Sequence, residues 1–74
     1  MLKHKIRRLL LKYDIEHEFI TDTLIEFYVG GICHSVDFIE SCEAILQIGE
    51  GSLKEVLDLH DENFKDVLIE IFQG

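Results

Sequence analysis

The chain has 74 residues, 47% of them hydrophobic and 30% charged, and its formal net charge is −8. A chain this short holds one small hydrophobic core, so we expect residues 1–74 to form a single domain with a thin margin of stability. The many aliphatic and phenylalanine side chains exclude a disordered chain, and the longest apolar runs are far too short for a membrane-spanning helix.

The charges are segregated along the chain. Five of the seven cationic residues fall within the first twelve positions, and all fifteen carboxylates come after them. Residues 1–13 therefore carry a formal charge of +5 and residues 14–74 carry −13, which together give the net −8. Such a distribution bears on partners and association, not on fold.

Residues 2–13 have the spacing of an amphipathic helix. The apolar stripe of this helix consists of Leu2, Ile6, Leu9, Leu10 and Tyr13. Lys5, Arg8 and Lys12 lie on the opposite side, and Leu11 projects away from the stripe. Because cations in the first turns oppose the helix macrodipole, an acidic neighbour would stabilise this helix.

Residues 15–34 change to the alternation of a β-hairpin or a three-stranded sheet. Gly30-Gly31 supplies the positive φ angles of a tight turn, and that turn pairs Phe27 with His34. The expected core face consists of Ile15, His17, Phe19, Ile25, Phe27, Val29, Ile32 and His34. The opposite face holds Leu24 and Tyr28 among carboxylates, so it is not cleanly polar.

Residues 35–48 fit two structures. Val36 and Phe38 could extend the third strand, or Ser35 could cap a helix that ends at Gly49. We favour the helix, with its first residue between Ser35 and Ser41. This segment decides whether the sheet has further strands.

Residues 53–72 indicate one long helix, introduced by a capping box from Ser52 to Glu55. Its apolar stripe consists of Leu53, Val56, Leu57, His60, Phe64, Val67, Leu68 and Ile71. The expected fold class is therefore α+β, with an N-terminal helix, an antiparallel β-hairpin or three-stranded sheet, and then two C-terminal helices packed on one sheet face.

The sequence carries no motif for a metal, a cofactor or catalysis. No C-x-x-C or H-x-x-x-H spacing occurs, and Cys33 and His34 are adjacent in a strand, so they point to opposite faces. His60-Asp61-Glu62 combines a base with carboxylates, but consecutive helical residues face different directions. We therefore expect no enzyme, no metal and no cofactor. Two cysteines without a signal-peptide pattern predict a reduced, cytoplasmic protein with free thiols.

Direct binding to nucleic acid would depend on the basic N-terminal helix alone. The charge of −13 on the rest of the chain opposes phosphate binding, and no nucleic-acid-binding motif is present. The apolar stripe of the helix is needed for the core, which argues against a role on a membrane surface. We expect neither nucleic acid nor membrane as a direct partner.

The long C-terminal helix predicts a column of carboxylates opposite its apolar stripe. The column consists of Glu55, Asp58, Glu62, Asp66 and Glu70. At 1.5 Å per residue their mean spacing is about 5.6 Å, against roughly 3.4 Å between charges along one DNA strand. Other carboxylates could add to the column if they share its side, namely Glu16, Glu18, Glu26, Glu40 and Glu43. Ile69, Phe72 and Tyr28 have no obvious place in the core, so they are the expected apolar anchors of an interface.

In size and charge the chain resembles the small inhibitors that phages and mobile elements use against host nucleases and polymerases. The small size, the acidic excess and the apolar residues without a place in the core predict a non-catalytic binding module. Within that class we favour an inhibitor, possibly DNA-mimic-like, that occludes the basic surface of a nucleic-acid-handling protein. The alternative is a self-associating structural or regulatory subunit. Its homodimer would form through the basic N-terminal helix and exposed apolar residues.

Overall fold

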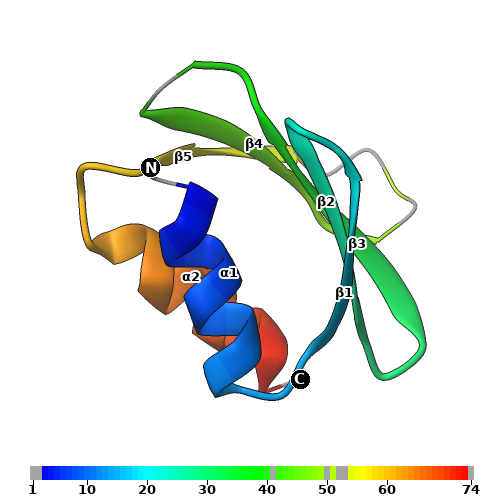
Figure 1. The fold of residues 1–74 in the computed structure, drawn as a ribbon. Helices are drawn as coiled ribbons and strands as arrows, with labels where there is room; N and C mark the ends of the chain where they lie inside the picture. Colours follow the sequence, from blue (N-terminus) through cyan, green and yellow to red (C-terminus); the bar gives the residue numbers. More distant parts are fainter. Residues whose placement is uncertain (1–2, 41, 50, 52–53, 74) are drawn as a thin grey trace.

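The computed structural model describes residues 3–40, 42–49, 51 and 54–73. In chain order the elements are α1 (Lys3–Lys12), β1 (Glu16–Thr21), β2 (Leu24–Val29), β3 (Ile32–Phe38), β4 (Glu43–Gln47), β5 (Lys54–Asp58) and α2 (Asn63–Phe72). The five strands form an antiparallel sheet in which each strand lies beside its neighbour in sequence. The sheet curves around both helices, which lie on one of its faces (Figure 1). We call this face the inner face and the opposite one the outer face.

The N-terminal helix and the hairpin after it are confirmed. Gly30 and Gly31 have φ angles of 59° and 81°, which a residue without Cβ adopts at little cost. The register of β2 and β3 places Phe27 opposite His34, as the turn predicts. On the expected core face, Ile25, Phe27 and His34 are buried. Phe19 and Ile32 are 38% and 54% exposed instead.

The prediction of a three-stranded sheet followed by two C-terminal helices is wrong. Residues 35–38 continue β3, residues 43–47 form β4, and residues 54–58 form β5. The sheet therefore has five strands, and a single described helix, α2, comes after it. Strands β4 and β5 are only five residues long, and over so few residues hydrophobic periodicity does not separate a helix from a strand.

Some of the sequence-based predictions fall on positions that are not described. Leu2, Ser41, Ser52 and Leu53 lie outside the described residues. The described part of the N-terminal apolar stripe therefore begins at Ile6, and the capping box from Ser52 to Glu55 stays a prediction. The long helix is wrong over its first half, because Lys54–Asp58 pairs with β4 as an antiparallel strand. Its second half is helical, since α2 spans Asn63–Phe72.

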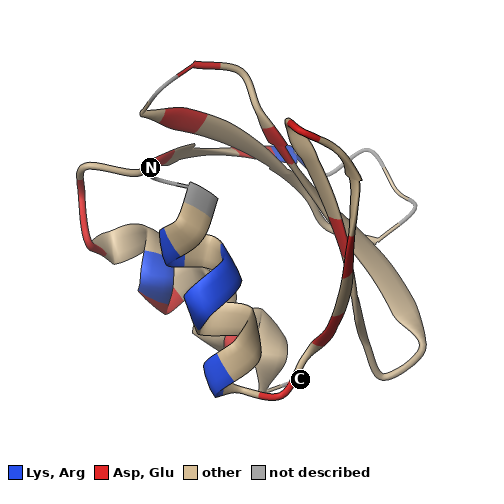
Figure 2. Cartoon of the chain, in the orientation of Figure 1, with Lys and Arg blue, Asp and Glu red and all other residues tan. Residues whose placement is uncertain are grey.

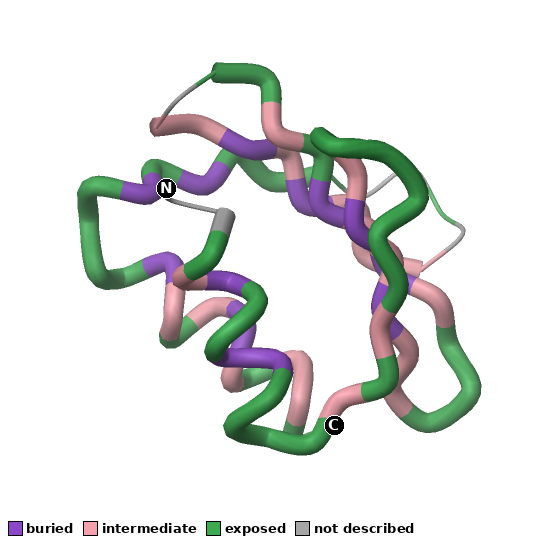
Figure 3. Tube along the Cα trace, in the orientation of Figure 1, coloured by how far each residue is buried: buried purple, intermediate pink, exposed green. Residues whose placement is uncertain are grey.

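The core lies between the inner face and the two helices (Figure 3). Its buried hydrophobic residues are Ile6, Leu9, Leu10, Ile25, Phe27, Val36, Ala44, Leu46, Leu57, Leu59, Phe64 and Leu68. Phe27 is fully buried, and its ring centroid lies 5.2 Å from that of His34 and 5.6 Å from that of Phe72. Because strand residues alternate between faces, burying these positions turns every second residue of the sheet to the outer face.

Candidate protein-binding surface

The outer face of the sheet lies opposite both helices, and no described element covers it (Figure 1). The strand registers arrange its side chains in rows across neighbouring strands. One row is Glu18, Glu26, Ser35, Gln47 and Lys54, and the next is Leu24, Asp37, Ile45 and Val56. The outer rows are Glu16, Tyr28 and Cys33 at one end and Glu43 with Asp58 at the other.

The outer face is strongly acidic. Six carboxylates point to this side, against one lysine, Lys54; they are Glu16, Glu18, Glu26, Asp37, Glu43 and Asp58. Within the described part of the chain, none of these six makes an ion pair of 4.0 Å or less. Figure 2 shows the same separation, with most Asp and Glu on strands and loops and most Lys and Arg on the helices.

Two pairs of these carboxylates lie directly opposite each other on neighbouring strands. Glu18 faces Glu26 across β1 and β2, and Glu43 faces Asp58 across β4 and β5. Like charges in this position destabilise a sheet, by about 0.2–1 kcal/mol for a pair. Both pairs therefore oppose folding of the free protein.

Apolar and weakly polar side chains lie among the carboxylates. Leu24, Tyr28, Cys33 and Ile45 are half-buried on this face, and Val56 is 63% exposed. Repulsion from the neighbouring Cys33, partial burial and the carboxylates of Glu26 and Glu18 raise the pKa of the Tyr28 hydroxyl. A tyrosine hydroxyl is protonated near neutral pH even at its ordinary pKa of about 10, so Tyr28 is a hydrogen-bond donor there.

The predicted carboxylate column does not exist as one surface. Glu55 and Asp58 belong to β5, where the odd spacing between them turns one to the inner face and the other to the outer face. Asp66 and Glu70 are exposed on α2. Glu62 precedes α2, and its carboxylate lies 2.9 Å from Lys65 Nζ and 4.0 Å from Lys5 Nζ. The hydrogen bond and charge of Lys65, with a smaller contribution from Lys5, lower the pKa of Glu62.

The three predicted anchors also separate. Ile69 is half-buried and packs against the core. Phe72 is half-buried between the rings of Tyr13, at 5.7 Å, and Phe27, at 5.6 Å. Tyr28 alone lies on the outer face, among the carboxylates. Five acidic residues of this face were not among the predicted site residues. Glu16, Glu18, Glu26 and Glu43 were expected only as possible additions to the column, and Asp37 was not expected at all. The alternation of residues 15–28 was the signal that could have found the first three.

The part of the chain that the structure describes was also searched for metal sites, membrane-spanning helices and disulfides. No group of three or more histidine, cysteine and carboxylate side chains there is arranged so that it could hold a metal ion, and neither described helix is long and apolar enough to cross a membrane. Cys33 and Cys42 are free thiols. Comparison of the chain with protein-family models, with curated proteins and with solved structures found no match.

His34 has a structural role in the core. It is 6% exposed, its ring stacks on Phe27, and its Nδ1 accepts a hydrogen bond of 2.9 Å from the backbone N–H of Gly49. Because Nδ1 accepts this bond, the ring is neutral and carries its proton on Nε2. Burial lowers the pKa of His34 below its ordinary value of 6.5.

We expect the stability of the protein to fall on mild acidification because of His34. In the unfolded chain this histidine takes up its proton at about pH 6.5, before it does so in the folded protein. The unfolded state therefore binds more protons, and the free energy of unfolding decreases as the pH is lowered through about 6.5. Denaturation of the wild type and of His34→Gln on both sides of this pH measures the effect. If the free energy of unfolding changed equally with pH in the two proteins, His34 would not be the histidine responsible.

Proposed function

We propose that this protein is a small non-catalytic binding module whose outer sheet face docks on a basic surface of another protein. The observation that carries this proposal is the pair of like-charge contacts, Glu18 with Glu26 and Glu43 with Asp58. Both contacts cost stability in the free protein, and a cationic partner would turn that repulsion into attraction.

The partner class is inferred from the arrangement of the charges. Neighbouring strands are about 4.8 Å apart, so the outer face presents a two-dimensional array of anions with apolar groups between them. Proteins that handle nucleic acids carry the complementary basic surfaces, which neutralise phosphates. We propose an inhibitor of such a protein, acting by occlusion, in the reducing cytoplasm where Cys33 and Cys42 stay free. The homodimer through α1 remains a prediction, without a specific observation in its favour.

The first experiment changes charge on the outer face without changing the fold. Glu18→Lys combined with Glu43→Lys converts both like-charge pairs into opposite-charge pairs, because each introduced lysine would face the remaining carboxylate, Glu26 or Asp58. The free energy of unfolding should rise, by about 0.2–1 kcal/mol for each pair. Capture of basic proteins from a lysate of the source organism should nevertheless fall at least tenfold, since electrostatic complementarity is lost.

The matched control places the same charge change elsewhere. Asp66→Lys combined with Glu70→Lys alters two exposed carboxylates of α2, on the other side of the molecule. Capture by this variant should match that of the wild type, and capture by the wild type should weaken steeply as salt is raised. Retention of the same proteins by both double variants, or at low and high salt alike, would reject the proposal.

A further inference from the structure

Strand β5 forms one edge of the sheet and has free backbone groups along it. β5 pairs with β4, and no other described strand lies beside it. The N–H of Leu59 donates a 2.7 Å hydrogen bond to the carbonyl oxygen of Cys42 and continues the same register. Hydrogen-bonded pairs alternate in an antiparallel ladder, so Leu57 and Glu55 also direct their backbone groups to β4. Lys54, Val56 and Asp58 therefore direct theirs to the open edge, which is a template for another strand. The carbonyl oxygen of Asp58 accepts a 3.1 Å hydrogen bond from the N–H of Asp61, so the free groups are those of Lys54 and Val56 and the N–H of Asp58.

The side chains on the outer side of β5 form a self-complementary series. Val56 is 63% exposed, the largest value among the exposed large hydrophobic residues. Lys54 lies two residues before it and Asp58 two residues after it, on the same face. When two copies of β5 pair antiparallel about Val56, the two valines lie opposite each other and each Lys54 lies opposite an Asp58 of the other copy.

Other registers lose this match. A slip of two residues places Val56 opposite Lys54 or Asp58 and leaves a charge without its counterpart, and a slip of one turns the side chains to opposite faces. Parallel pairing in register places lysine beside lysine and aspartate beside aspartate, which is unfavourable. The antiparallel register about Val56 also forms two backbone hydrogen bonds between the valines.

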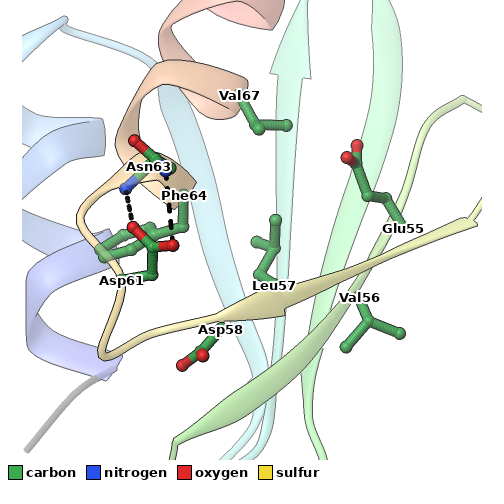
Figure 4. A pocket seen from close by; sticks show the side chains of 8 residues that line it. All are labelled: Glu55, Val56, Leu57, Asp58, Asp61, Asn63, Phe64 and Val67. Atoms are coloured by element: carbon green, nitrogen blue, oxygen red, sulfur yellow. Dashed lines mark hydrogen bonds between the residues drawn. The ribbon is translucent and has the colours of Figure 1, made fainter.

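The inner side of β5 is hollowed at the same edge. A cavity of about 220 Å³ lies between β5 and α2, with Glu55, Leu57, Phe64 and Val67 among its lining residues. Figure 4 shows Leu57 and Val67 on the helix side of β5 and Val56 on the other side. In the proposed register Glu55 of one copy faces Leu57 of the other, so no like charges oppose each other within this cavity.

We propose that a second copy of this chain docks on the edge of β5, antiparallel and centred on Val56, to form one continuous ten-stranded sheet. The interface is isologous, because each copy contributes the same strand. Its two-fold axis runs perpendicular to the sheet, so both outer faces point to the same side. The dimer presents two acidic faces next to each other, and its formation does not depend on the partner that those faces bind.

Light scattering and sedimentation of the full chain over a concentration series test this interface. Lys54→Glu places a glutamate opposite Asp58 of the other copy, twice by symmetry, and should raise the dissociation constant of the dimer about tenfold. Lys54→Glu combined with Asp58→Lys swaps the two charges and should return the constant to within a fewfold of the wild type.

A proline at Val56 tests the backbone pairing separately. Val56→Pro removes an N–H that points to the open edge and leaves the pairs with β4 intact, so the monomer should keep its far-ultraviolet circular dichroism while the dimer is lost. Ile39→Lys, at a residue that is 48% exposed and lies outside β5, is the control and should dimerise like the wild type. A wild type that stays monomeric at every concentration, or a dimer insensitive to both β5 changes, overturns the proposal.

Discussion

Replacing Phe27 with alanine should lower the free energy of unfolding by about 3–5 kcal/mol. Phe27 is fully buried on the inner face, where its ring contacts those of His34 and Phe72. A chain of this size has only about 4–11 kcal/mol of stability in total. The variant should therefore lose a large part of its folded population, which chemical denaturation followed by circular dichroism would measure.

Tyr28→Ala is the matched control for this substitution. Tyr28 comes directly after Phe27 and is also aromatic, but it lies half-buried on the outer face. Its removal should cost about 1 kcal/mol or less. Phe27→Leu, which keeps most of the buried volume, should retain a measurable unfolding transition between those of the wild type and Phe27→Ala. Equal losses for Phe27→Ala and Tyr28→Ala would contradict the assignment of the two faces.

The second large effect is expected at Leu57. Leu57 is 2% exposed on the inner side of β5, whereas its neighbour Val56 is 63% exposed on the outer side. Leu57→Ala should cost about 2–5 kcal/mol of unfolding free energy, and Val56→Ala within about 0.5 kcal/mol. The measurement is denaturation at a concentration where the protein is monomeric, since self-association adds to apparent stability.

The same two substitutions also distinguish the two secondary structures that the sequence allows. In a helix over residues 53–72, Val56 and Leu57 would share the apolar stripe, and both substitutions would be costly. In the strand they point to opposite faces, so only one is costly. Losses of similar size at the two positions would contradict the strand.

The elements predicted correctly are those with local causes. The helix over Lys3–Lys12 is explained by its periodic leucine and isoleucine residues, and the hairpin is explained by the two glycines with positive φ. In each case the residues that decide the structure lie within a few positions of one another, so neither depends on distant contacts.

The elements predicted wrongly have distant causes. The run at Glu43–Gln47 fits either period, and it becomes a strand because β3 and β5 supply its hydrogen-bond partners. The run at Lys54–Asp58 becomes a strand because β4 does so. Such pairing overrides local propensity, since an unpaired backbone group in a buried element costs more than an unfavourable helix or strand preference.

The carboxylates of the outer face also fall into those that local sequence places and those that distant pairing places. Glu16, Glu18 and Glu26 alternate with apolar residues in the first two strands, so the sequence already places them on one side. Asp37, Glu43 and Asp58 join them only through the registers of β3, β4 and β5. Mistaking β5 for a helix moved Asp58 onto a column with Glu62 and Asp66 that the folded chain does not contain.

The amino-acid sequence by itself determined how much charge this protein carries, the basic character of its first helix and the acidic character of residues 14–74. Tertiary structure alone decided which carboxylates share a face and which strand edge stays open. The physical reason is that successive side chains turn by about 100° along a helix and by about 180° along a strand. The position of each charge in space therefore depends on hydrogen bonds made with residues far away in the chain.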